Sequence, residues 1–280
     1  MAQLTLLSML LLRVKIFINC HHIIACICES SVQSVQSTSG DATYSISTIA
    51  GTGNGNLKVN VPALEAKFNE IGGLAQSKNG DVYVTANVKH VVLKFEFNKE
   101  EGTWTNVTII AGTRSSGKGA DDVLGTESAL NGPNGISLIE NSSGDVTAIL
   151  IADNYSYRIR KLDMSTRKIT TIAGNGAQGF SGDGSSAKDA QLNYPHHVYY
   201  DKSTGDIYIT DSGNRRIRRV RDGIISTVVG KTCTGSDELG DGGPAIDACL
   251  SVPRQFTMNN AGEWFIVDSG NNRIRKVYLN

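Results

Sequence analysis

Short runs of alternating apolar and polar residues, separated by turn residues, recur along most of the chain. Residues 206–211 alternate clearly, and two further strand-like runs follow at 215–220 and 224–230, with Gly, Asp or Asn residues between the three runs. Alternation with a period of two predicts β-strands with two different faces, and the short turns predict antiparallel neighbours. No helical period extends through the repeated region. We therefore predict an all-β fold.

Two sequence anchors indicate that these strands belong to four repeats. The first anchor, a strand end of the type Ile-Ala-Gly or Val-Val-Gly, occurs at 49–51, 110–112, 172–174 and 228–230. The second, a β-rich triplet, occurs at 84–86, 151–153, 209–211 and 266–268. Four short strands per repeat are typical of β-propeller blades. The predicted sets of first to third strands are 71–97, 135–162, 197–220 and 255–279, and the predicted fourth strands are 44–50, 105–111, 167–173 and 223–229.

The repeats resemble the NHL family in the segments IYITDSGNRRIRRV, WFIVDSGNNRIRKV and ITTIAGNGAQGFSGDG, and the long Gly-rich crossings resemble the NHL region of teneurins. The resemblance covers residues 44–280 and implies a propeller with blades at about 71–111, 133–173, 195–229 and 253–279 plus strand 44–50. The last repeat lacks a fourth strand, so the N-terminal strand 44–50 would complete it in a closed four-bladed ring. The alternative is part of a larger ring with two open edges.

The N-terminal residues lie outside the repeats. Residues 4–12 and 16–28 are mostly apolar and are separated by a short segment with Arg13 and Lys15. Neither run reaches the roughly 20 residues needed to span a bilayer, and the layout is typical of a secretory signal peptide. We predict a signal peptide or hydrophobic leader over 1–30; a mis-assigned start and a signal-anchor are the alternatives. The Ser-, Gln- and Thr-rich segment 31–43 predicts a disordered linker.

Cysteine usage and glycosylation sequons agree with export. Beyond the leader only Cys233 and Cys249 remain, in one crossing between repeats. We predict that they form a disulfide in an oxidising compartment, with two reduced thiols as the alternative. Asn-x-Ser/Thr triplets make Asn106, Asn141 and Asn154 candidate glycosylation sites. These features predict a secreted or cell-surface protein.

The aligned repeats share three columns of charged residues. The columns contain Asp153, Asp211 and Asp268, then Arg158, Arg216 and Arg273, and then Arg160, Arg218 and Arg275. The first repeat has Ala86, Val91 and Leu93 instead, so all three charges are lost together. Joint loss predicts an Asp–Arg brace that fixes the turn before the third strand. The alternative is a basic face that binds an anionic partner.

The sequence shows no catalytic constellation. Its 27 basic and 27 acidic residues cancel, and no aromatic residues are interleaved with the arginines, which argues against a nucleic-acid partner. At the first-strand position only one repeat supplies histidines, so we predict neither a metal site nor a cofactor. The crossings that contain Asp183 and Asp241 lack the pattern of a phosphate or Ca²⁺ loop and are interpreted as turns.

We therefore predict a non-enzymatic NHL-type propeller that binds a protein or a glycan and has no membrane span beyond the leader. The predicted binding residues are Arg216, Arg218, Arg219, His196, His197 and Arg254. Loops 98–102, 141–144 and 231–249 are further expected contact sites. One alternative is a metal-dependent lyase- or hydrolase-like enzyme that uses the central channel. The other is a structural fragment that associates through open edges.

Overall fold

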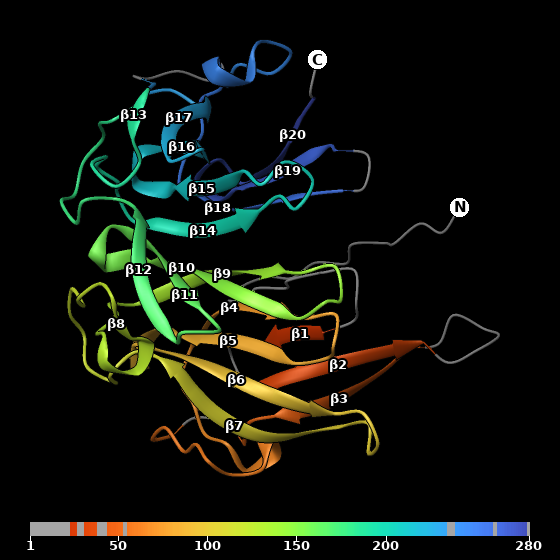
Figure 1. Cartoon of the computed structure of the whole chain (residues 1–280). Coiled ribbons are helices and arrows are strands. Elements are labelled where there is room, and N and C mark those ends of the chain that lie inside the picture. Colours follow the sequence, from red (N-terminus) through yellow and green to blue (C-terminus); the bar gives the residue numbers. More distant parts are fainter. Residues whose placement is uncertain are drawn as a thin grey trace.

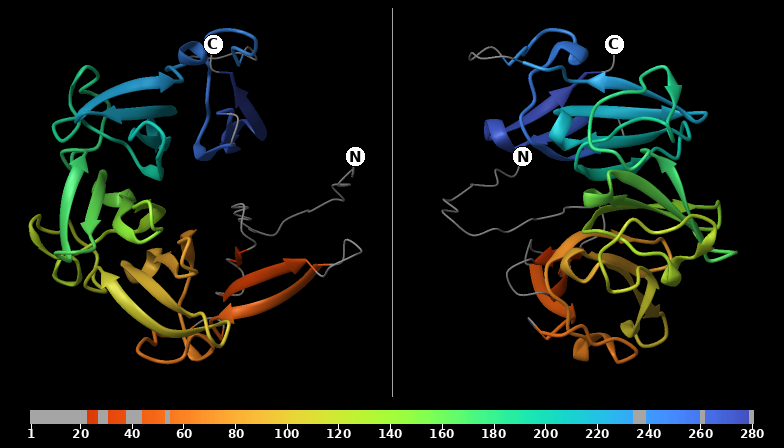
Figure 2. Two further views of the ribbon diagram at one scale, coloured as in Figure 1. Left: turned by 45° about the vertical axis from the view of Figure 1, so that its right-hand side comes forward. Right: turned by 90° about the vertical axis from the view of Figure 1, so that its left-hand side faces the viewer.

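The computed structural model describes residues 23–26, 31–37, 44–52, 55–233, 239–259 and 262–278. Five antiparallel sheets follow one another along an arc (Figure 1, Figure 2). Within these ranges the only helical segments are 3₁₀ turns of three residues. The predicted all-β propeller architecture is confirmed. No helix of the described part is long and apolar enough to cross a membrane.

Four of the sheets are the four predicted repeats, and we name them blades II to V. Blade II contains β4 (Ile71–Gln76), β5 (Val82–Ala86), β6 (Val91–Asn98) and β7 (Thr103–Ala111). Blade III contains β8 (Val123–Leu124), β9 (Pro133–Glu140), β10 (Val146–Asp153), β11 (Arg158–Asp163) and β12 (Lys168–Ala173). Blade IV contains β13 (Ser185–Ser186), β14 (Pro195–Tyr200), β15 (Ile207–Asp211), β16 (Arg216–Arg221) and β17 (Ile224–Val229). Blade V contains β18 (Pro253–Met258), β19 (Trp264–Asp268) and β20 (Arg273–Val277).

The hydrophobic core lies between the blades. All five residues of β5 are buried, because both faces of an inner strand pack against neighbouring blades. Between blades IV and V, Tyr208 packs against Phe256 and Trp264 in one apolar cluster. The innermost strands β4, β9, β14 and β18 lie next to one another around the axis. Blades II, III and IV thus each pack between two neighbouring sheets, and blade V packs against blade IV.

The N-terminal sheet, blade I, corrects two predictions. It contains β1 (Ile23–Cys26), β2 (Ser31–Ser37) and β3 (Tyr44–Ala50), in that order. The predicted completion of the last blade by strand 44–50 is wrong, because the backbone of β3 pairs with β2. The predicted disordered linker is wrong over Ser31–Ser37, because a β-ladder uses backbone groups and tolerates the polar side chains that suggested disorder. Residues 38–43 and 1–22 lie outside the described residues, so the signal peptide stays a prediction.

Blade V has an open outer edge. Its sheet has the order β18-β19-β20, and β20 has no strand partner on its other side among the described residues. On β20, the side chain of Ile274 is 67% exposed. Figure 2 shows the sheets of blades I and V separated by a gap in the arc. The described residues therefore form an open arc and not a closed four-bladed ring.

A disulfide joins the two ends of the crossing that leads into blade V. Cys233 lies after β17 and Cys249 lies before β18, and their Sγ atoms are bonded. The bond links positions 16 residues apart in the chain. It therefore ties the base of the long crossing to the blade that follows it.

Candidate binding site

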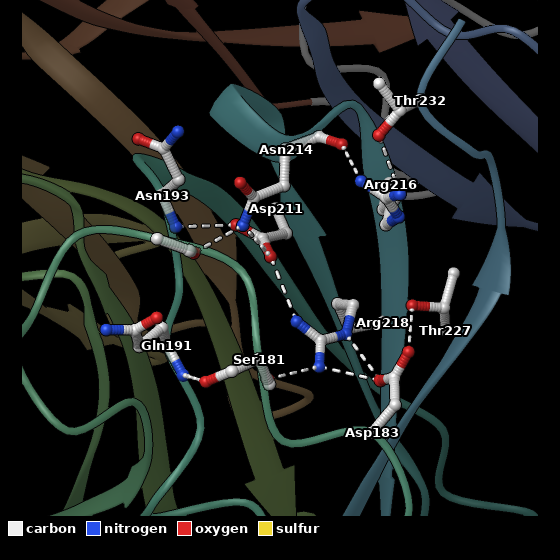
Figure 3. A network of polar contacts seen from close by, with 11 residues as sticks. Ser181, Asp183, Gln191, Asn193, Asp211, Asn214, Arg216, Arg218, Thr227 and Thr232 are labelled. Carbon is white, nitrogen blue, oxygen red and sulfur yellow. Dashed lines mark hydrogen bonds and ion pairs between the residues drawn. The ribbon is translucent and has the colours of Figure 1, made fainter.

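A buried arginine in each of three blades holds the crossing that leads into it. In blade IV the side chain of Arg218 is fully buried. Figure 3 shows the polar contacts around it. Its Nη1 donates to Asp211 Oδ2 at 3.2 Å, while its Nε and Nη2 donate to Asp183 Oδ1 at 3.0 and 2.7 Å. Its Nη2 also donates to the Ser181 carbonyl oxygen. One guanidinium thus connects β15, β16 and the Gly-rich crossing.

The same arrangement recurs in blades III and V. Arg160 pairs with Asp121 at 2.9 Å and lies 3.9 Å from Asp153. Arg275 pairs with Asp241 at 2.6 Å and with Asp268 at 3.4 Å. The ion pairs therefore use the Asp column and the second Arg column that the sequence singled out.

The structure also changes the predicted brace in two ways. Arg158, Arg216 and Arg273 form no ion pair with the Asp column. Conversely, Asp183 and Asp241 are ion-pair partners, so their interpretation as simple turn residues is wrong. Spacing carried a signal for this role, because Asp121 and Asp183 each lie nine residues after the glycine that ends the preceding strand motif.

The brace also fixes the loops at one end of the blades. Asp211 Oδ1 accepts the backbone N–H of Asn193, and Asp211 Oδ2 accepts Asn214 Nδ2. Asn193 precedes β14, and Asn214 ends the turn Ser212–Asn214. Burial raises the pKa of Asp211 to about 6, against the lowering by these hydrogen bonds and by Arg218. Desolvation likewise raises the pKa of Asp153 to about 6.

Three tyrosines held by these loops form an exposed aromatic cluster between blades III and IV. Tyr155 and Tyr157 lie in the turn after β10, and Tyr194 lies directly before β14. The ring of Tyr194 contacts those of Tyr155 and Tyr157 edge-to-face, with centroid distances of 5.7 and 5.3 Å. The side chain of Tyr155 is 55% exposed and that of Tyr194 is 37% exposed. We call these three residues the tyrosine cluster.

Two members of the tyrosine cluster occupy an unfavourable backbone conformation. Tyr157 has φ +57° and Tyr194 has φ +49°, in the left-handed region that favours Gly and Asn. The position equivalent to Tyr157 in blade V is Asn272, and the position equivalent to Tyr194 in blade III is Gly132. A bulky residue there costs about 1 kcal/mol. His90 and Arg215 occupy the position of Tyr157 in blades II and IV, and Val252 occupies that of Tyr194 in blade V, all at positive φ, so this conformation belongs to the blade turns in general. The feature particular to this place is the aromatic cluster itself.

Sequence reasoning missed the tyrosine cluster. Its members come from two repeats and lie 39 residues apart at the extremes, so only the fold brings them together. A signal was nevertheless present. The turn reads Asn-Tyr-Ser-Tyr at 154–157, where the next two repeats have Ser-Gly-Asn followed by Arg or Asn. Tyrosine combines a large apolar face with a hydroxyl, which suits recognition of proteins and sugars.

The six predicted binding residues do not form one surface. Arg218 is buried in ion pairs, so its prediction as a binding residue is wrong. Arg216 lies over the ring of Phe180, at 3.9 Å from the centroid, and donates to Asn214 O and Thr232 Oγ1. Arg219 lies on the same strand, and its Nε is buried with no hydrogen-bond partner among the described residues. Arg254 is exposed on β18.

The two histidines lie on the innermost strand β14, separated from the arginines of β16 by β15. His196 Nε2 is 3.3 Å from Asn134 Nδ2, and His197 contacts Phe256 edge-to-face. Burial lowers the pKa of His197 to about 4. In the part of the chain that the structure describes, no three His, Cys, Asp or Glu side chains are grouped as metal ligands.

The three glycosylation candidates differ in accessibility. Asn106 and Asn141 are exposed. Asn154 is buried, and its Nδ2 donates to the Pro195 carbonyl oxygen. Because this nitrogen is the atom that would carry a glycan, the prediction at Asn154 is wrong for the folded chain.

Comparison with known proteins agrees with the repeat pattern. The family model "NHL repeat" matches residues 192–219. NHL repeat-containing protein 2 of Bos taurus is 24% identical over 199 residues, which is 63% of this chain and 26% of that protein. Teneurin-3 of Mus musculus is 34% identical over 101 residues, which is 31% of this chain and 4% of that protein. The chain therefore spans only a minor part of these relatives.

A solved structure shows the same fold over most of the chain. An auxiliary nutrient binding protein from Bacteroides thetaiotaomicron superposes with a TM-score of 0.55 and 17% identity. The match covers 92% of this chain and 66% of that one.

Proposed function

We propose, from its membership of the NHL-repeat family and from the tyrosine cluster, that this chain is a non-enzymatic scaffold that binds a protein or a glycan. The observation that carries the proposal is the exposed cluster of Tyr155, Tyr157 and Tyr194. Tyrosines are enriched in interface hot spots because they bury much surface at little cost in side-chain entropy. The auxiliary nutrient binding protein with the same fold is a precedent for ligand binding by such a propeller.

The scaffold is rigid where the tyrosines attach. Asp153 Oδ1 accepts the N–H of Asn131 at 2.6 Å, and this bond fixes the turn that carries Tyr155 and Tyr157. Asp211 fixes the residue before Tyr194 in the same way. Preorganised contact residues lose little conformational entropy on binding, so they convert contact area into affinity efficiently. This rigidity supports recognition by the loop ends of blades III and IV.

A secreted or cell-surface location is part of the proposal. The disulfide between Cys233 and Cys249 supports it, because disulfides persist in oxidising compartments. Expression of the full chain with a C-terminal tag in cultured eukaryotic cells, followed by N-terminal sequencing of tagged protein from the medium, tests both export and leader cleavage. Tagged protein that stays in the cytosol with free thiols would contradict this part.

Arrays of glycans and of extracellular proteins test the binding function. We expect the full chain to bind at least one ligand and the Tyr155→Ser/Tyr194→Gly variant to lose that binding. Tyr278→Ser is the matched control, because Tyr278 is an exposed tyrosine at the far end of blade V. Ligands bound equally well by the double variant would refute the role of the tyrosine cluster. A circular dichroism spectrum and a thermal melt of the double variant establish that it is folded at the temperature of the array.

A further inference from the structure

A cavity lies at blade III, between the crossings that precede and follow it and beside the Asp–Arg brace of that blade. Its volume is about 480 Å³. Lys118 and Asp121 line it from the crossing before blade III, Arg158 from β11, and Lys188 from the crossing after blade III. Three basic side chains from three segments therefore face one space.

These three cations have no carboxylate partner among the described residues. Lys118 Nζ donates to the Gly176 carbonyl oxygen, and Arg158 Nη1 donates to the Gly119 carbonyl oxygen at 3.4 Å. Arg158 Nε is buried without a hydrogen-bond partner in the described part of the chain. The one carboxylate in the lining, Asp121, pairs with Arg160, which also lies 3.9 Å from Asp153. The lining thus carries three cations and one carboxylate, an excess of positive charge.

In blade IV a side chain fills the equivalent space. Gly117 and Gly179 occupy equivalent positions, since each donates its N–H to the leucine that closes its crossing. The following residues, Lys118 and Phe180, are therefore equivalent. In blade IV the Phe180 ring packs under Arg216. In blade III the ring is replaced by a second cation, which leaves the space beside Arg158 open.

Lys188 is the second basic residue that occurs in only one of the crossings. It follows Ala187, whose carbonyl oxygen accepts the N–H of Gly174. Each of the other three crossings has an equivalent hydrogen bond, so the residue after its acceptor is the counterpart of Lys188. These counterparts are Leu64, Thr126 and Ile246. The fold therefore needs no basic residue at either lysine position. Both lysines occur where they surround the same cavity.

We infer that this cavity binds a small anion, namely a phosphate or sulfate monoester on a body of roughly the size of a hexose. Lys and Arg donate charge-assisted hydrogen bonds to such oxyanions, and Arg158 has a donor to spare. The volume lies within the roughly 300–1,000 Å³ that small-molecule sites occupy, well above the size of a bare ion. The inference does not depend on the tyrosine cluster.

Calorimetric titration of the full chain with glucose 6-phosphate, glucose 6-sulfate and glucose tests this site. We expect one or both esters to bind and glucose not to bind, and the tighter ester identifies the anion. Lys118→Phe introduces the residue found at the equivalent position in the crossing before blade IV, Phe180. Lys188→Leu introduces the residue found at the equivalent position of the first crossing, Leu64. Each variant should weaken ester binding by about tenfold or more, because one charge-assisted contact is lost.

Lys202→Ala is the matched control, since Lys202 is an exposed lysine in the turn after β14. It should bind the ester as the wild type does. The inference is overturned if neither ester binds, if glucose binds equally well, or if Lys202→Ala weakens binding as much as the two cavity variants. Lys188 is exposed, so Lys188→Leu keeps the test valid even if Lys118→Phe fails to fold.

Discussion

The buried arginine of blade IV gives the sharpest test of what holds the propeller together. Replacing Arg218 with Leu removes four hydrogen bonds to Asp211, Asp183 and Ser181. Asp183 is partly exposed and can be hydrated, but Asp211 is fully buried. Breaking a buried pair in this way costs about 3–5 kcal/mol of unfolding free energy, because one charge is left without its partner.

The first repeat supplies the matched control. Blade II has Ala86 and Leu93 at the positions of Asp211 and Arg218, and both side chains are fully buried there. The double variant Asp211→Ala/Arg218→Leu copies this apolar solution. Replacing a whole buried pair by apolar residues is often nearly neutral, so we expect the double variant to be more stable than the Arg218→Leu single variant.

The change with pH in the stability cost of Arg218→Leu gives an independent test. Loss of Arg218 removes a positive charge that lowers the pKa of Asp211, so this pKa in the Arg218→Leu variant rises above its wild-type value of about 6. A folded-state pKa above the unfolded value favours the folded state at low pH, and this benefit is lost as the pH rises through the folded-state pKa. The cost of Arg218→Leu should therefore be smaller at pH 5 than at pH 7.5.

Urea unfolding monitored by tryptophan fluorescence and circular dichroism measures these differences. The wild type, the single variant and the double variant are compared at both pH values. A single variant as stable as the wild type at pH 7.5 would refute the brace. So would a double variant that is less stable than the single one, or a cost that grows at pH 5.

Three further predictions concern the channel, the disulfide and the open edge. Burial lowers the pKa of His197 to about 4 from 6.5, so only the unfolded chain takes up this proton in that window. Thermal unfolding of His197→Gln should therefore lose less stability between pH 7 and 5 than the wild type, and equal losses would contradict this account. Replacing Cys233 and Cys249 with Ser should lower the unfolding free energy by about 3 kcal/mol, and urea unfolding of the wild type under reducing conditions should give the same value. The unpaired edge of β20 should cause concentration-dependent association in light scattering, which Ile274→Lys should reduce; a constant monomer mass for the wild type would contradict this.

The blades were predictable because their signals are local. Alternation and turn residues fixed the strands of the four repeats to within two residues at either end. The strand at Tyr44–Ala50 was also predicted, but the sheet that contains it was not, because its neighbour Ser31–Ser37 pairs through its backbone and has no alternating apolar pattern. The Asp211–Arg218 pair followed from joint loss in the first repeat. Its second carboxylate, Asp183, was missed because it lies 35 residues away in a segment that also looks like a turn.

The binding features were harder to predict because each of them depends on residues from different repeats. Tyr155 and Tyr194 meet only when blades III and IV pack side by side. Lys118 and Lys188 face one cavity only because the crossings before and after blade III both line it. Sequence periodicity identifies the residues that the repeats share. The tyrosine cluster and the basic cavity instead depend on residues that one repeat has and the others lack.

This contrast makes the repeats an internal control for function. Blade II replaces the whole brace with apolar residues and still folds, so the fold accepts more than one solution at its most buried polar position. Positions that only build a blade should therefore vary freely among residues that satisfy packing and backbone geometry. Tyr155 instead is an exposed aromatic residue where blades IV and V have Gly213 and Gly270, and Lys118 replaces a ring that fills space in the next blade. Packing within a blade requires neither residue and both lie at blade III, so recognition is expected there and not at the central channel.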